Sequence, residues 1–176
     1  MIDSAASRIE IHLFRAGMFG GLGDNHVILL TRFSGTASSS PGVPWAVRVA
    51  GEASSLRVVD PGTPEGTRAK VQEKMLGPTQ LDAANYPTIV LVSRSLQPGD
   101  GEQTWRLGAD VTVHGVTRAI EFPLHWSEQG GRLRIQGQTS LGLTDFNIQP
   151  IRLGFGTVKV RNEFDLVYDV ALEPQP

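Results

Sequence analysis

The stretch 103–143 constrains the fold most, because apolar and polar residues alternate through three segments that two turn signals separate. Taking Gly115-Val116 as a two-residue hairpin loop places glycine at the first central position, as a type II′ turn requires. Opposed residues then share one apolar face, which a slip of one residue would destroy. The predicted pairs are Trp105–Trp126, Leu107–Leu124, Ala109–Phe122, Val111–Ile120 and Val113–Arg118.

The same apolar face continues into a third strand if residues 128–131 form the next loop. The region is therefore predicted to be an antiparallel meander with one apolar and one polar face. At one end of the meander, Trp105, Trp126 and Leu133 are predicted to lie side by side. One predicted pair is unfavourable, because Asp110 would face Glu121 and like charges repel across a ladder. The further pairs are Trp126–Leu133, Leu124–Ile135, Phe122–Gly137 and Ile120–Thr139.

Eight strands are expected in all, and 20 glycines and 11 prolines fit the many turns between them. A single open sheet of eight such strands would leave its apolar face uncovered, whereas closure buries that face and removes the edges. We therefore predict an all-β fold, an eight-stranded antiparallel barrel, a size that either fills with side chains or holds one small ligand. The strands are expected at about 7–15, 26–36, 44–58, 88–97, 103–114, 117–127, 132–143 and 156–172.

One short helical insert is expected between the third and fourth strands. Thr63 is a candidate N-cap, Pro64 suits the first turn, and Gly77-Pro78 ends the helix. A narrow stripe of three residues repeats every four positions, at Thr67, Val71 and Met75. With no internal repeat or linker, residues 1–176 are expected to form a single domain with a core of about 7–172.

Composition and charge exclude several classes of function. The net charge of −2 and pI of about 6.1 give no basic field for a phosphate backbone, so no nucleic acid partner is expected. The absence of cysteine excludes disulfides and thiolate metal sites. No transmembrane segment is expected, since no run approaches about 18 apolar residues. The chain is expected to be soluble, cytoplasmic if it is complete, and periplasmic or secreted if a signal peptide has been removed.

Motifs for catalysis or metal binding are missing from the sequence. No nucleophile elbow, P-loop or dinucleotide fingerprint occurs, and the glycines of 17–23 are interpreted as a turn. His114 and His125 lie roughly 26 Å apart along the predicted strands, too far to share a metal. We expect no catalytic residues and no metal. The enzymatic alternative is a small hydrolase or isomerase with a polar site near Asp24 and His26.

Three segments, in order and at matching spacing, resemble the YceI-like family. Residues 81–89 read LDAANYPTI and are similar to its "LDA..YP.I" segment, and residues 110–118 read DVTVHGVTR and resemble its "LTIHGVTK" hairpin. Residues 139–146 read TSLGLTDF and are similar to its "LNRSDFG" strand end. A helical element at 68–75 also agrees, and the resemblance covers about 7–172. It departs at Asn147, where the family has glycine, and in the first hairpin at 17–26.

This resemblance implies a lipocalin-like barrel whose long apolar cavity binds polyisoprenoid or similar amphiphilic lipids. Members of the family are often periplasmic and some are cytoplasmic. The implied function is non-covalent binding, carriage or storage of an isoprenoid-type or fatty lipid, with no cofactor other than a bound polyisoprenoid, quinone or fatty-acid-like ligand. A solid barrel that binds protein on its outer face is a further alternative, and homodimerisation is left open.

The predicted ligand cavity is built mainly from the apolar face of the meander. Ala109 and Gly137 flank Phe122 and are expected to leave space, so that Gly137→Leu would fold normally and exclude the ligand tail. Candidates for a head-group contact are Arg118, Arg68 and His26. The predicted cavity residues are Leu107, Ala109, Val111, Ile120, Phe122, Leu124, Ile135, Gly137, Phe164, Leu166 and Met75.

Overall fold

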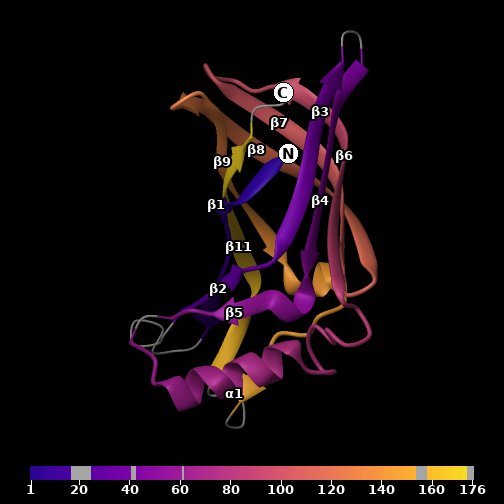
Figure 1. The fold of residues 1–176 in the computed structure, drawn as a ribbon. Helices are drawn as coiled ribbons and strands as arrows, with labels where there is room; N and C mark the ends of the chain where they lie inside the picture. Colours follow the sequence, from indigo (N-terminus) through magenta and orange to yellow (C-terminus); the bar gives the residue numbers. More distant parts are fainter. Residues whose placement is uncertain (17–24, 41–42, 61, 154–157, 174–176) are drawn as a thin grey trace.

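The computed structural model describes residues 1–16, 25–40, 43–60, 62–153 and 158–173, and these form one curled antiparallel sheet with a single α-helix (Figure 1). The glycine-rich turn predicted at 17–23 lies outside the described residues. Two 3-10 turns, η1 (Ala53–Ser55) and η2 (Leu143–Phe146), interrupt the strands. The strands are β1 (Ile2–Ala16), β2 (His26–Leu30), β3 (Phe33–Ser40), β4 (Val43–Glu52), β5 (Leu56–Val58), β6 (Thr88–Pro98), β7 (Thr104–Val113), β8 (Val116–Gln129), β9 (Arg132–Gly142), β10 (Arg152–Leu153) and β11 (Val158–Leu172).

The order of strands shows how the sheet curls back on itself. Hydrogen-bonded neighbours run β3-β4-β6-β7-β8-β9-β11-β1-β2-β5, and β10 pairs with β11. The strands at the two ends of this path are β3 and β5. In the chain, β3 comes directly after β2, and β5 comes after β4 and η1. The chain therefore crosses twice between the two ends of the sheet, at Thr31-Arg32 and at η1.

Hydrogen bonds tie these two crossings together. The Thr31 N–H and hydroxyl both donate to the Ser55 carbonyl, at 3.3 and 2.7 Å. The Arg32 N–H donates to Ser55 Oγ at 3.0 Å, and the Glu52 N–H donates to the Arg32 carbonyl at 3.0 Å. Ser55 has no exposed surface. Farther from the crossings, Ile2 Cδ1 of β1 takes the place that a Cβ on Gly35 of β3 would occupy. Side-chain packing therefore joins the two ends of the sheet at this point.

The predicted count of eight strands is a simplification that the structure corrects. The expected strands 26–36 and 44–58 are each divided at the crossings, into β2 and β3 and into β4 and β5. At each bend the backbone groups hydrogen-bond to the other crossing instead of continuing a ladder. The two halves of each expected strand therefore pair with strands in different parts of the sheet. The described sheet contains eleven strands for this reason.

The meander at 104–142 has the predicted strands and faces, but its register differs by two residues. The first loop is His114-Gly115, with Val113 opposite Val116. Both loop residues have positive φ, 51° and 72°, the geometry of a type I′ turn rather than a type II′ turn. Trp105 therefore faces Leu124 and not Trp126, although all three share a face. The other observed pairs include Leu107–Phe122, Ala109–Ile120 and Val111–Arg118.

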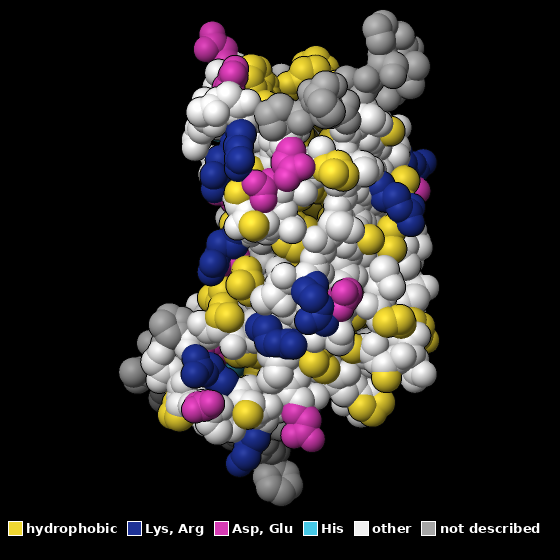
Figure 2. Space-filling model, viewed as in Figure 1, with side chains coloured by type: hydrophobic (Ala, Val, Ile, Leu, Met, Phe, Trp, Pro, Cys, Tyr) yellow, Lys and Arg dark blue, Asp and Glu magenta, His cyan; other side chains and the backbone are white. Residues whose placement is uncertain are grey.

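The second loop differs in the same way, since Gln129 pairs with Arg132 across Gly130-Gly131. Trp126 consequently faces Ile135 rather than Leu133. The two-residue shift also removes the unfavourable predicted pair of carboxylates: Asp110 lies opposite Ala119, and Glu121 opposite Gly108. The outward face remains polar, and the side of the molecule seen in Figure 2 carries charged side chains of both signs with hydrophobic ones scattered between them.

Helix α1 (Glu65–Leu76) lies across one end of the curled sheet (Figure 1). Its N-cap is Pro64 and no side chain caps it, so the predicted capping role of Thr63 is wrong. The Gln72 amide docks the helix on β5, accepting from the Val58 N–H at 2.8 Å and donating to the Leu56 carbonyl at 2.6 Å. Among the described residues, no helix has the length and apolarity that a membrane crossing requires.

We expect Gly115→Ala to lower the free energy of unfolding more than Gly130→Ala does. Both glycines have positive φ, 72° and 58°, where an alanine costs about 1–2 kcal/mol. A Cβ on Gly115 would also lie 2.6 Å from Tyr86 Cε1, whereas one on Gly130 would meet nothing within 4 Å. The added crowding should cost at least about 1 kcal/mol more in urea unfolding. Removing the ring with Tyr86→Ala should abolish the difference; equal losses in the wild-type background would refute this turn geometry.

Candidate functional site

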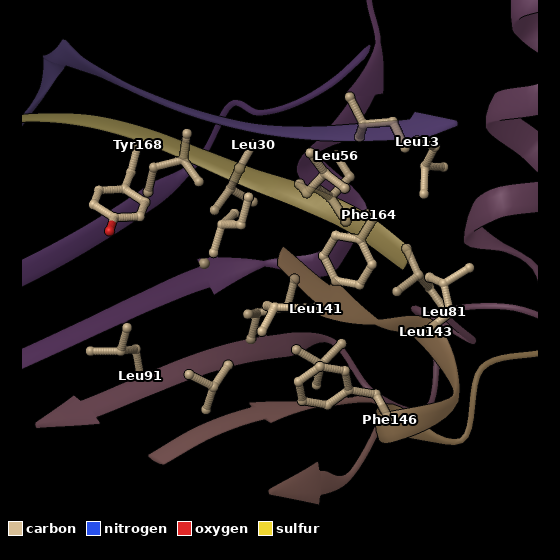
Figure 3. A pocket seen from close by; sticks show the side chains of 18 of the residues that line it. Leu13, Leu30, Leu56, Leu81, Leu91, Leu141, Leu143, Phe146, Phe164 and Tyr168 are labelled. Atoms are coloured by element: carbon tan, nitrogen blue, oxygen red, sulfur yellow. The ribbon is translucent and has the colours of Figure 1, made fainter. Parts of the chain in front are cut away.

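The curled sheet encloses a cavity of about 510 Å³. This lies within the range of roughly 300–1,000 Å³ that is typical of small-molecule sites. Leucine side chains from opposite walls point into it: Leu13, Leu30 and Leu56 from β1, β2 and β5, and Leu91 and Leu141 from β6 and β9 (Figure 3). The lining is almost entirely apolar. The presence of this cavity means that the interior of the curled sheet is hollow rather than filled with side chains.

The buried core is correspondingly divided into two clusters, and residues of both line the cavity. One cluster includes Leu107, Phe122 and Tyr168, from β7, β8 and β11. The other is formed by Ile28, Leu30, Leu56 and Met75, from β2, β5 and α1. Ile9 and Leu81 pack against both clusters, and residues of both clusters form the cavity wall.

The stripe along α1 supplies one end of this cavity. Thr67, Val71 and Met75 all line it, and Thr63 lines it just before the helix begins. Phe146 of η2 is 2% exposed and also contributes to the wall. The η2 turn is held by Asp145, whose carboxylate accepts the Gly142 N–H at 3.0 Å. Asn147 follows with φ of 58°, a left-handed conformation that asparagine adopts more readily than most residues, so it can replace the glycine expected there.

Most of the predicted cavity residues lie on the cavity wall. Ala109 is instead 1% exposed and packed in the core cluster beside the wall, and Ile120 packs against the same cluster. Gly137 is also absent from the lining. That these side chains contact a ligand stays a prediction. The predicted residues that line the cavity are Leu107, Val111, Phe122, Leu124, Ile135, Phe164, Leu166 and Met75.

The space beside Gly137 is occupied, which corrects its interpretation as an opening in the cavity. Gly137 lies opposite Tyr168 of β11, and a Cβ on it would collide with the Tyr168 ring and the Pro123 carbonyl. The Tyr168 hydroxyl donates to that carbonyl. Burial raises the pKa of Tyr168, so its hydroxyl stays a neutral donor. The Tyr168 ring also packs edge-on against Phe122, with centroids 6.0 Å apart.

The three candidate head-group residues differ in position. Arg118 is exposed and its guanidinium donates to the neighbouring Thr117 carbonyl, and Arg68 is a half-buried residue of α1; neither lines the cavity. His26 does line it, at the start of β2. Arg15 and Lys74 also line the cavity.

His26 forms a pair with Asp60 that the sequence did not indicate. His26 Nδ1 lies 2.5 Å from Asp60 Oδ2, and the Val27 N–H donates to Asp60 Oδ1 at 2.6 Å. The Asp60 side chain is 3% exposed and that of His26 is 18% exposed. Asp24, the partner expected for His26, lies outside the described residues. The two paired residues are 34 positions apart, and no local motif joins them.

His12 and His114 contact neighbouring protein groups. His12 pairs with Glu10 at 2.7 Å; burial raises the pKa of that carboxyl, but hydrogen bonds from His12 and Arg8 outweigh it and lower the pKa overall. His114 lies 3.2 Å from the Phe146 carbonyl, and its ring packs edge-on against Tyr86. Within the described residues, no three potential metal ligands come together.

The cavity wall is suited to binding an apolar chain. The cavity offers a long apolar surface, and the His26–Asp60 pair is an acid–base group. No serine or cysteine stands among the described residues of the cavity wall. Thr63 and Thr67 supply aliphatic hydroxyl groups to the wall, and no hydrogen bond joins either of them to His26 among the described residues.

The sequence model of the YceI-like domain family matches residues 1–172. A "UPF0312 protein" from Pseudomonas syringae pv. tomato is 30% identical over 95 residues, which cover 51% of this chain and 47% of that protein. Another, from Pseudomonas savastanoi pv. phaseolicola, is 33% identical over 75 residues, covering 39% of this chain and 38% of that protein. These alignments span about half or less of the length of the curated relatives.

Solved structures share the fold at low sequence identity. BcnA of Burkholderia cenocepacia has a TM-score of 0.77 at 16% identity, covering 98% of this chain and 100% of that chain. A polyisoprenoid binding domain from Saccharophagus degradans, described as implicated in plant cell wall breakdown, has a TM-score of 0.69 at 12% identity, covering 99% and 97%. A Campylobacter jejuni YCEI protein has a TM-score of 0.58 at 9% identity, covering 84% and 85%.

Gly137→Ala should destabilise the protein by about 1–3 kcal/mol, because the added methyl group overpacks a filled site. Tyr168→Phe removes the hydroxyl that crowds this position, at a cost of about 1 kcal/mol for the lost hydrogen bond. Urea unfolding of both single variants and the double variant should therefore give a loss smaller than the sum of the single losses. A Gly137→Ala protein with wild-type stability would restore the interpretation of Gly137 as a cavity residue.

Proposed function

Because this chain belongs to the YceI-like domain family, we propose that it binds a long-chain hydrophobic lipid of isoprenoid or fatty type non-covalently, and carries or stores it. The observation that carries this proposal is the apolar cavity of about 510 Å³ within the curled sheet. The polyisoprenoid binding domain from Saccharophagus degradans, which shares the fold over 99% of this chain, also supports it.

The cavity would bind such a chain mainly through burial of its surface. Each CH₂ group removed from water contributes about 0.8 kcal/mol, so a long tail gains affinity from its length without specific polar contacts. The many leucine, isoleucine and valine side chains along the wall provide this surface and offer few hydrogen-bonding groups to a competing polar ligand. A lipid with one apolar tail matches that distribution.

The two alternatives fit the structure less well. A solid barrel acting only through its outer face would have a filled interior, whereas this one contains a cavity. Besides the acid–base pair of His26 and Asp60, a hydrolase or isomerase would need polar groups that bind a polar substrate, and the cavity wall offers few of them. We therefore propose no cofactor and no covalent chemistry for this site.

The proposal is tested first by identifying the natural ligand. The purified protein is extracted with organic solvent, and the extract is analysed by mass spectrometry beside one from the heat-denatured and washed protein. We expect stoichiometric recovery of a long-chain lipid from the native protein alone. In addition, the equilibrium titration of delipidated protein with a fluorescent fatty acid should saturate and fit a single binding site. Absence of both results would contradict the proposal.

A cavity-filling variant with a matched control tests the location of the tail. Ala37 of β3 lines the cavity, whereas Ala46, on the paired strand β4, is exposed and does not. Ala37→Phe should displace two or three CH₂ groups of the tail and weaken binding about tenfold or more. Ala46→Phe should leave the affinity in the titration unchanged. Equal affinities for the two variants would place the tail elsewhere.

A further inference from the structure

The polar groups of the cavity wall gather toward the end that α1 covers. Arg15 is near the end of β1, His26 begins β2, and Thr63, Thr67 and Lys74 belong to α1 or precede it. The wall at the other end is formed by apolar residues such as Ile2, Val170 and Leu172. An amphiphilic ligand would therefore lie with its polar group toward α1 and its tail toward the chain termini.

His26 stands out among these polar residues because the structure fixes the orientation of its ring. Both oxygens of the buried Asp60 carboxylate are engaged, Oδ1 by the Val27 N–H and Oδ2 by His26 Nδ1. A carboxylate only accepts hydrogen bonds, so the ring proton of a neutral His26 resides on Nδ1. The other nitrogen, Nε2, then carries a lone pair.

The His26 side chain is also partly accessible, with 18% of its surface exposed. No side-chain nitrogen or oxygen that is fully buried lacks a partner in the described part of the chain, and Asp60 is the hydrogen-bond partner found there for His26. His26 belongs to the cavity wall, and its bond to Asp60 through Nδ1 leaves Nε2 as the ring nitrogen that can bond a ligand there. A hydrogen-bond acceptor at the wall of an apolar cavity increases the affinity for a ligand that carries a donor, because an acceptor left unpaired there costs free energy.

We propose that the Asp60-held His26 selects the ligand's head group, accepting a hydrogen bond at Nε2 from a hydroxyl. The class of ligand is a long-chain alcohol, or a phenol or hydroquinone with one apolar tail, in preference to ethers and esters, which bring only acceptors. This inference rests on the proposed function and adds the polarity of the ligand's head group. Asp60 is a positioning residue, because it acts through the tautomer of His26.

The first test compares two ligands that differ only in the hydroxyl proton. Hexadecanol and its methyl ether are titrated into delipidated protein at about pH 8, above the ordinary pKa of a free imidazole, by displacement of a fluorescent fatty acid. One hydrogen bond should favour the alcohol about fivefold. His26→Phe should remove this preference while both ligands still bind, and the exposed His125→Phe should retain it.

The second test moves the proton without removing the histidine. In Asp60→Asn the side-chain oxygen still accepts from the Val27 N–H, and the amide donates to His26 Nδ1, which places the ring proton on Nε2. The ether can then accept from Nε2, so the preference for the alcohol should disappear. Nitrogen NMR of the imidazole should report the proton on Nδ1 in the wild type and on Nε2 in the variant. Asp110→Asn, on the outer face, should behave as the wild type.

The outcomes separate this inference from the proposed function. Failure of both ligands to bind the wild-type protein would refute lipid binding itself. Equal binding of alcohol and ether, or an Nε2 proton in the wild type, would overturn the role of His26 and leave the cavity intact. If Asp60→Asn does not fold, the wild-type tautomer and the His26→Phe titration still decide the matter.

Discussion

The alternation of apolar and polar side chains along every long strand is the constraint on which this structure depends. A sheet with one apolar face must cover that face, and this chain has only a single 12-residue helix to do so. The sheet therefore covers itself, by curling until its two ends meet at the Thr31-Arg32 and η1 crossings. Its inward side chains are mostly aliphatic, and an apolar cavity remains among them. Atoms that line such a space lack contact partners on one side, and a bound chain would supply them.

The sequence determines which face each strand turns inward, but not which residues lie opposite one another. Side chains repeat every two positions along a strand, so a shift of two residues leaves both faces unchanged. The hydrophobic pattern fits the predicted register and the observed one equally well. The choice is made by the turn, where His114 takes a positive φ that is uncommon for a residue with a side chain. The predicted contact of Asp110 with Glu121 was the one signal against the wrong register.

Cavity residues were predictable where they depend on strand alternation, and not where they depend on distant segments. Leu107, Val111 and Phe122 follow from the meander alone and line the cavity. Gly137 was misjudged because its neighbour Tyr168 comes from β11, whose pairing no hairpin sets. The divided strands were missed for a similar reason. Buried Ser55 organises that corner through hydrogen bonds to residues more than 20 positions away, and its sequence context carries no signal of them.

The buried polar pair at the cavity wall originates in a local feature, the end of the ladder between β2 and β5. The Val59 N–H still donates to the Val27 carbonyl at 2.9 Å, as in a continuing antiparallel pair. The Val27 N–H, however, is accepted by the Asp60 side chain rather than by a backbone carbonyl. This exchange completes the ladder and brings a carboxylate into the interior, where it needs a second donor to offset its desolvation. His26, adjacent to Val27, provides that donor, so the oriented imidazole at the cavity wall follows from the way the strand pair ends.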